Sequence, residues 1–295
     1  MGESIKFNIL TILPKYFYYV ILILIFSVAF TLYLQYQNIT QPIREIVGTK
    51  EPVQATFQAF YLVIASVLFA ILILFLLIKK KILIIQYIFV YTFSIGVFIL
   101  FFLFSQPLKH LLLKSFPNVT FPLIFILILF FSSLLLFGIF KAKNIHIQNH
   151  SLIIVSCIFG SIIGGILEFI QLAIFLIVLS LYDIFAVSVG PIGKIIDRIE
   201  PSENAGNSQR FSSAEFDYVR GMFLELDKIE IGIGDIVLYS ALLSNTLSIF
   251  SFKVFLAIIG ISIGGFLTIF LLNKFKRLPG LPLPVFITLA FLFFL

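Results

Sequence analysis

Nine apolar stretches, each close to the length needed to cross a lipid bilayer, constrain the fold of this chain most. A membrane-spanning α-helix needs about 20 mainly apolar residues. The predicted spans are about 16–34, 59–78, 82–104, 121–140, 152–167, 169–190, 231–248, 254–272 and 279–295. Of the 295 residues, 61% are hydrophobic and only 12% are charged, and the mean hydropathy is +1.16. We therefore predict an all-α, multi-pass membrane protein rather than a soluble domain.

Lysine and arginine residues set the orientation, because positive side chains stay on the cytoplasmic side of a membrane. If the N-terminus is inside, 15 of the 20 Lys and Arg residues fall in predicted inner segments. We predict nine transmembrane helices with the N-terminus cytoplasmic and the C-terminus outside, in the cell membrane if the source is prokaryotic. The net charge of +6 then describes contact with the lipid bilayer. Since no basic face is interleaved with aromatic residues, we expect no nucleic-acid partner.

The chain reads as a single polytopic domain over residues 1–295. Helices one to six occupy about 1–190, a polar cytoplasmic loop occupies about 191–230, and helices seven to nine occupy about 231–295. The Ser, Asn, Glu and Gly content of the loop is typical of a mobile segment. Near its end, the alternation around Leu226, Ile229 and Ile231 is compatible with a short strand or with the lead-in to a helix.

The acidic residues point to a functional site within the membrane. Of the 14 Asp and Glu residues, only Asp183 and Asp235 lie inside predicted spans. No Lys, Arg or His lies inside a span, although an isolated carboxylate in hydrocarbon is costly. Asp183 is roughly 10 Å, and Asp235 roughly 8 Å, from the inner end of its helix. Two partnerless acids at matched depth on consecutive antiparallel helices therefore predict a functional pair.

Two neighbouring carboxylates can perform peptide hydrolysis without any other group. When two carboxyl groups are close, ionisation of one makes ionisation of the other unfavourable, so the two share a proton. One member then acts as a base that activates water, and the other as an acid that assists the carbonyl oxygen and the leaving nitrogen. This is the chemistry of an aspartic protease, and we expect it to need neither metal nor cofactor.

Other chemistries are less compatible with the sequence. A zinc protease would need an H-E-x-x-H motif, which is absent, and His110, His146 and His150 all fall in predicted loops. A Ser–His dyad would need a histidine inside the membrane, so Ser161 within "FGSIIGG" is predicted to serve helix packing. A prepilin-type aspartyl peptidase and a proton-coupled transporter that uses both aspartates remain as alternatives, as does a scaffold without catalysis.

Three short motifs in order resemble those of a known family. They are Tyr182-Asp183, the "GIGD" of Gly232 to Asp235, and Pro279-Gly280-Leu281 near the C-terminus. Together with the nine predicted spans, they resemble the presenilin and signal peptide peptidase family of intramembrane aspartyl proteases. The local sequence around the motifs is typical of a microbial, archaeal member.

This resemblance implies a role for each motif. Asp183 and Asp235 would be the catalytic pair, and Tyr182 and Gly234 would shape the site. The segment 279–281 would lie beside the aspartates and help to bind an unwound substrate. Gly280 departs from the family's Pro-Ala-Leu pattern, and we expect its looser backbone to alter substrate preference.

The glycines ahead of Asp235 and the depth of the site predict what it binds. Without side chains, Gly232 and Gly234 would let another backbone approach the carboxylate. The expected partners are transmembrane helices of membrane proteins or signal-peptide remnants, because soluble peptides do not reach this depth. A homo-oligomer is compatible with the same reading.

Overall fold

The computed structural model describes most of the chain. The described residues are 9–36, 40, 52–78, nine scattered positions between 84 and 98, 121–142, 144–188, 223–226, 229–249, 252–272 and 278–294. Of the predicted third span, 82–104, only the nine scattered positions are described, and each of these is helical. His110 and most of the predicted polar loop lie outside the described residues.

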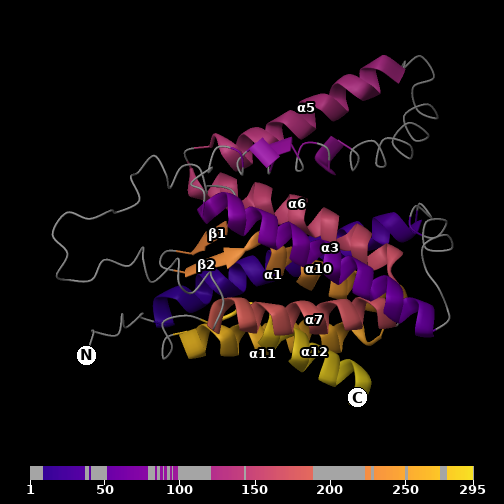
Figure 1. The fold of residues 1–295 in the computed structure, drawn as a ribbon. Helices are drawn as coiled ribbons and strands as arrows, with labels where there is room; N and C mark the ends of the chain where they lie inside the picture. The colour runs from indigo at the N-terminus through magenta and orange to yellow at the C-terminus, as the bar shows by residue number, and fades with distance from the viewer. Residues whose placement is uncertain are drawn as a thin grey trace.

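Within the described residues the fold consists of eight helices and one β-hairpin (Figure 1). The helices are α1 (Ile9–Tyr36), α3 (Pro52–Ile78), α5 (Phe121–Phe140), α6 (Ile145–Ile166), α7 (Phe169–Ser188), α10 (Ile233–Ile249), α11 (Val254–Leu272) and α12 (Pro282–Phe294). The strands are β1 (Phe223–Leu226) and β2 (Ile229–Gly232). The predicted all-α class is therefore correct for the helices and omits the hairpin.

The helices follow the predicted spans, although α1, α3 and α6 each begin seven residues earlier than predicted. The spans predicted at 121–140 and 254–272 match α5 and α11 to the residue. In contrast, α6 begins at Ile145 rather than at 152, capped by the Asn144 side chain, which accepts a bond from the His146 N–H. His146 and His150 therefore lie in a helix and not in a loop. The criterion of an apolar stretch does not detect this polar first part of α6.

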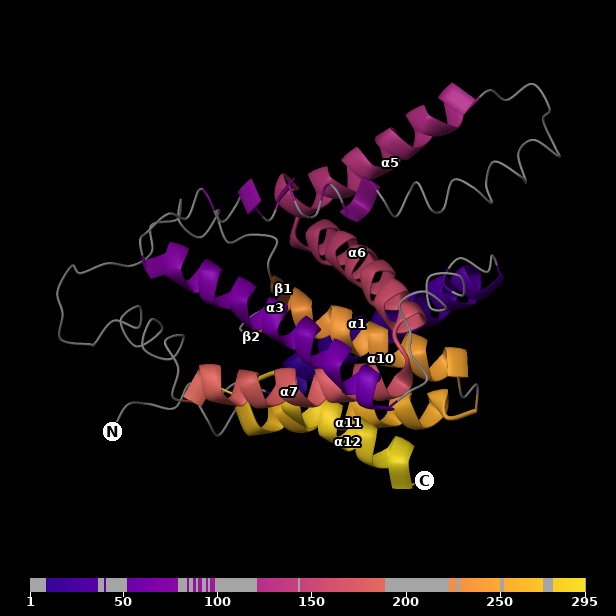
Figure 2. The same cartoon turned by 45° about the vertical axis from the view of Figure 1, so that its right-hand side comes forward.

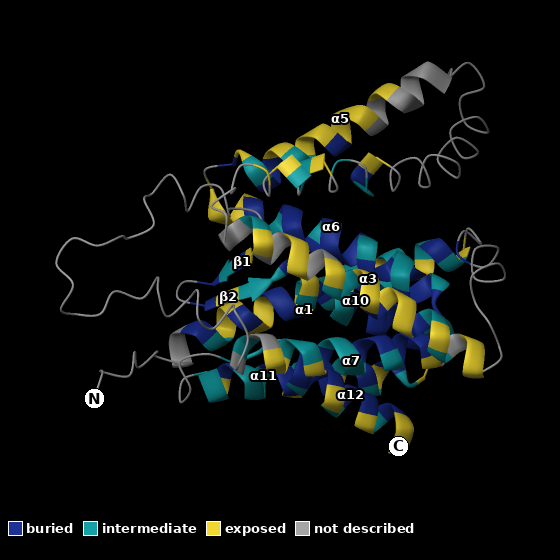
Figure 3. Cartoon of the chain, viewed as in Figure 1, coloured by how far each residue is buried: buried dark blue, intermediate teal, exposed yellow. Residues whose placement is uncertain are grey.

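Several helices are apolar enough to cross a membrane, and the protein is a multi-pass membrane protein. Three are both long and apolar: Ile12–Tyr36, Ile145–Ile166 and Val254–Leu272. Shorter apolar segments lie in α3, α5, α7, α10 and α12. Large apolar side chains are exposed along α3 and α5 (Figure 3), as expected for surfaces that face lipid rather than water.

The helix α10 lies in the middle of the molecule (Figures 1 and 2). It packs on α6 and α1 on one side and on α11 and α7 on the other. Its residues Ala241 to Thr246 are all buried. In both views α5 leaves the rest of the bundle, and it packs mainly on α6. The helix that carries Asp235 is therefore enclosed by four other helices.

Small and polar residues hold α10 tightly against α6. A Cβ on Gly164 would overlap the carbonyl group of Ala241, so the two backbones approach closely because Gly164 has no side chain. The Ser244 hydroxyl donates to the Ser161 carbonyl at 2.9 Å, and Asn245 Nδ2 donates to the Gly164 carbonyl at 2.9 Å. Such close contacts are typical of helices packed within membranes. The predicted packing role of Ser161 is confirmed.

The β-hairpin replaces the predicted start of the seventh span. Residues 229–232 form β2, and α10 begins directly after it at Ile233. The antiparallel register pairs Phe223 with Gly232, Leu224 with Ile231, Glu225 with Glu230, and Leu226 with Ile229. Leu224, Leu226 and Ile229 are buried against α1, α6 and α10. Of the two readings left open by the alternating pattern, the strand is correct.

Candidate active site

The two predicted aspartates lie at the same end of the helical bundle as the hairpin. Asp183 lies near the C-terminal end of α7, and Asp235 lies in the first turn of α10, just after β2. Both side chains are half-buried. The N-terminus of a helix carries partial positive charge, which favours a carboxylate in the first turn. The helix N-terminus thus contributes one favourable interaction with Asp235, and the described residues place no cation beside it.

Both carboxylates contact one short segment ahead of α12. The Leu281 N–H donates to Asp183 Oδ2 at 3.3 Å. A Cβ on Gly280 would lie 3.3 Å from the Cγ of Asp235 and closer still to its Oδ2. Neighbouring Cα atoms are about 3.8 Å apart, so the two acids flank the same few ångströms of backbone. The structure therefore brings Asp183, Asp235, Gly280 and Leu281 together.

The environment of Gly280 explains why this position suits a glycine. The Asp235 carboxylate occupies the space that a side chain at residue 280 would fill. The φ angle of Gly280 lies outside the left-handed range of +20° to +160°, so its backbone conformation is open to other residues. Room for the carboxylate is thus one reason that the structure gives for this glycine, and the effect of a looser backbone on substrate preference stays a prediction.

Tyr239 is a site residue that the sequence analysis missed. It lies one turn after Asp235 on α10, and its hydroxyl donates to the Gly280 carbonyl at 2.9 Å. This bond ties the segment before α12 to the helix that carries Asp235. The signal was present in the sequence, because residues four apart share a helix face and a tyrosine near a buried acid is a candidate partner.

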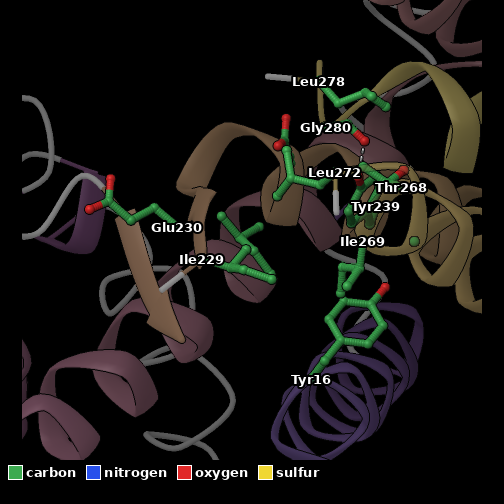
Figure 4. Close-up of a pocket in the computed structure, with 12 residues that line it drawn as sticks. Tyr16, Ile229, Glu230, Tyr239, Thr268, Ile269, Leu272, Leu278 and Gly280 are labelled. Carbon is green, nitrogen blue, oxygen red and sulfur yellow. Dashed lines mark hydrogen bonds between the residues drawn. The ribbon is translucent and has the colours of Figure 1, made fainter. Parts of the chain in front are cut away.

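A cavity of about 150 Å³ lies beside Asp235 (Figure 4). Its walls come from α1, β2, α10, α11 and the segment before α12. Figure 4 shows Ile229 and Glu230 on the hairpin side, and Tyr239, Gly280 and Leu278 on the other. The Tyr16 hydroxyl from α1 packs where a side chain on Gly265 would lie. Since a water molecule occupies about 30 Å³ in the liquid, the cavity has room for several next to the carboxylate.

The remaining predicted site residues have looser contacts with the two aspartates, or none that is described. A Cβ on Gly232 would lie 3.6 Å from Asp235 Oδ2, an ordinary contact, and a Cβ on Gly234 would meet no atom within 4 Å. Tyr182 and Pro279 are half-buried, and no hydrogen bond within the described residues joins either of them to the aspartates. Room for a second backbone beside Gly234 is therefore present, while its use stays a prediction.

Metal ligands do not gather within the described part of the chain, where no group of three or more His, Cys, Asp or Glu residues could hold an ion. His150 instead makes contacts of another kind. Its Nε2 lies 2.9 Å from the Tyr18 hydroxyl, and its Nδ1 lies 2.5 Å from the His146 carbonyl. The contact with Tyr18 connects the first part of α6 to α1.

Comparisons with known proteins bear on the fold of the chain. No family model matches the chain. Over 155 residues it is 26% identical to Presenilin-B of Dictyostelium discoideum, a stretch that spans 52% of this chain and 31% of that protein. The fold is similar to a solved presenilin family intramembrane aspartate protease, with a TM-score of 0.58 and 17% identity over 92% of this chain and 96% of that one. The fold is presenilin-like.

The predicted resemblance is thus confirmed at the level of the fold. The structure places α7, which carries Asp183, next to α10, which carries Asp235, and next to α12. The aligned stretch covers only about a third of the curated relative, so the activity of that whole protein does not transfer with the similarity.

Proposed function

We propose that this protein is an intramembrane aspartic endopeptidase in which Asp183 and Asp235 form the catalytic pair. The observation that carries the proposal is their meeting at residues 280 and 281, from two different helices. Two aspartates with independent structural roles would not be expected to contact the same two residues of backbone. Acidic residues inside membrane-spanning segments are rare and usually functional.

The mechanism follows from the two carboxylates and the adjoining cavity. One carboxylate accepts a proton from a water molecule, which attacks the peptide carbonyl. The other carboxyl group donates a hydrogen bond to the carbonyl oxygen and then helps to protonate the leaving nitrogen. The pair titrates as a unit, so the starting proton belongs to both. Asp235 lines the cavity, which supplies the water.

The substrate is the transmembrane helix of another membrane protein or a signal-peptide remnant. A helix hides its peptide bonds in intrahelical hydrogen bonds and must first unwind. An extended segment can then pair with the edge of β2 ahead of Gly232 and with the segment 279–282, by strand addition. The open space beside Gly234 gives such a segment access to Asp235. We propose nine spans with a cytoplasmic N-terminus, which puts the site near the cytoplasmic face.

Replacement of each aspartate tests the catalytic pair. Asp183→Asn and Asp235→Asn should each lower cleavage of a helical reporter substrate by at least about 100-fold, the scale of general acid–base catalysis. Both variants keep the side-chain shape and lose a partly buried charge, so their thermal unfolding midpoints should equal or exceed that of the wild type. Purified protein in detergent and in liposomes serves for both measurements.

Inhibitors provide the control for this test. A hydroxyl-bearing mimic of the tetrahedral diol should bind wild-type protein and lose affinity in both Asn variants, because it contacts both carboxylates. Metal chelators and serine-directed reagents should leave cleavage unchanged. Substantial cleavage by a well-folded Asp235→Asn protein, or inhibition by a zinc chelator, would contradict the assignment.

A further inference from the structure

Asn149 holds the outer edge of the β-hairpin. It lies in the second turn of α6 and is 1% exposed. Its Nδ2 donates to the Glu225 carbonyl at 2.8 Å, and its Oδ1 accepts from the Glu225 N–H at 3.2 Å. Nδ2 also lies 3.1 Å from the Tyr19 hydroxyl on α1. A single side-chain amide therefore pairs with β1 as a neighbouring strand would.

These bonds reveal which backbone groups of the hairpin face outward. In an antiparallel pair, residues alternate between those bonded to the partner strand and those that point away from it. The backbone N–H and carbonyl of Glu225 both form hydrogen bonds with Asn149. Glu225 and its cross-strand partner Glu230 are therefore a pair whose backbone groups point away from the neighbouring strand. On β1 the outward groups of Glu225 are bonded to Asn149. On β2 the outward groups of Glu230 are directed to the opposite edge.

The hairpin and the candidate catalytic helix share the same support. Asn149 belongs to α6, and α6 is also the helix on which α10 packs through Gly164 and Ser244. β2 runs into α10 without a break, and Asp235 follows Gly232 by three residues. The bonds from Asn149 hold β1 at a fixed position on α6. Because β2 pairs with β1, they therefore also hold the β2 edge at a fixed position relative to the Asp235 carboxylate.

We propose that Asn149 is a positioning residue, which closes the β1 edge of the hairpin, holds β2 in register with Asp235 and so directs an extended substrate strand to the β2 edge at Glu230. The inference rests on the proposed proteolytic function and deepens it. The substrate strand pairs with β2 through its backbone, and the register of that pairing decides which peptide bond reaches the aspartates. Loss of the Asn149 bonds should therefore change where substrates are cut, besides how well they bind.

The two hydrogen bonds between Asn149 and Glu225 are called the clamp below. Hydrogen exchange tests the clamp without any need for proteolytic activity. In the Asp235→Asn background, Asn149→Ala should lower the protection of amides in residues 223–232 by about tenfold, the scale of a lost hydrogen bond or two. Amides within α6 and α10 should keep their protection. Tyr19→Phe is the matched control, because it removes one contact of Asn149 and leaves both bonds to Glu225 intact; its hairpin should exchange like that of the wild type. Unchanged exchange in Asn149→Ala would overturn the clamp.

Product analysis tests the positioning role. With a transmembrane reporter, Asn149→Ala should raise KM about tenfold while kcat changes less than about threefold, and mass spectrometry should show cuts on both sides of the main wild-type position. Asn149→Asp, which keeps the shape and loses the donor to the Glu225 carbonyl, should shift the products in the same way if the Ala variant folds poorly. A uniform loss of kcat with one unchanged cut would overturn positioning. A wild type that cleaves nothing would refute the proposed function, whereas the exchange result decides the clamp alone.

Discussion

Gly280 connects the two halves of the candidate site. Its carbonyl accepts the Tyr239 hydroxyl, its missing side chain leaves room for the Asp235 carboxylate, and the next residue donates its N–H to Asp183. Three contacts thus converge on two residues of backbone. The position of this segment and the positions of the two carboxylates depend on each other, so a shift of one displaces the other.

Side chains added at residue 280 should therefore impair catalysis by displacing Asp235. Gly280→Ala should lower kcat by about 10- to 100-fold and Gly280→Val by more, since a misplacement of about 1 Å in a catalytic group can cost 100-fold. Because the carboxylate itself moves, a helical substrate and a short unfolded peptide should lose activity equally. Parallel kinetics on both substrates check this. A loss confined to the helical substrate would instead favour the backbone-freedom role expected from the sequence.

At the scale of elements, the hairpin carries an acidic pair on its outer face. Glu225 and Glu230 face each other across the strands, and like charges directly opposite are destabilising. The protein around the Glu230 carboxyl group removes part of its water and raises its pKa above the ordinary 4.5, and the Glu225 charge raises that pKa further. The folded hairpin thus holds a proton on Glu230 more firmly than the unfolded chain does.

Hairpin stability should accordingly fall as the pH rises. Above pH 4.5 the folded state binds more protons at Glu230 than the unfolded state, so stability decreases through that window until the folded pKa is passed. Glu230→Gln should remove this dependence and increase hairpin stability at pH 7 by a few tenths of a kcal/mol, the scale of a cross-strand pair. Protection factors of residues 223–232 at pH 4 and pH 7 measure it. Glu225→Gln is the control, and it should flatten the dependence only in part. A wild-type hairpin more protected at pH 7 would contradict the argument.

The sequence predicts some of these elements better than others, for physical reasons. Hydrocarbon demands long apolar helices, so α5 and α11 are found to the residue and Asp183 and Asp235 stand out as exceptions. The polar start of α6 is invisible to the same criterion, because Asn149 and His150 look like loop residues until β1 and α1 pack on them. The spacing of Tyr239 from Asp235 marks it as a candidate, but its bond to Gly280 depends on how α10 meets the segment before α12, which no local pattern contains.

On the scale of the whole molecule, all site features gather at one end of the bundle. The hairpin, the first turn of α10 and the last turns of α7 lie together there (Figure 1). The turn at Leu167 and Glu168, between α6 and α7, lies at the other end. An acidic hairpin face does not lie in hydrocarbon, so this end of the bundle meets the aqueous interface. With the predicted cytoplasmic N-terminus, that interface is the cytoplasmic one.

Substrate cuts should therefore keep a fixed distance from the cytoplasmic interface. The first cut should fall within roughly two helical turns of the cytoplasmic end of a substrate helix, because Asp235 lies in the first turn of α10. Three leucines inserted in the outer half of a reporter helix should leave the cut unchanged, since they do not alter its distance from the inner interface. Three leucines inserted between the cut and the inner interface should move the cut by about the inserted length. Mass spectrometry of the products from both reporters reads the position directly. Cuts that follow the outer end would place the aspartates on the opposite side of the membrane, while leaving their convergence on residues 280 and 281 unchanged.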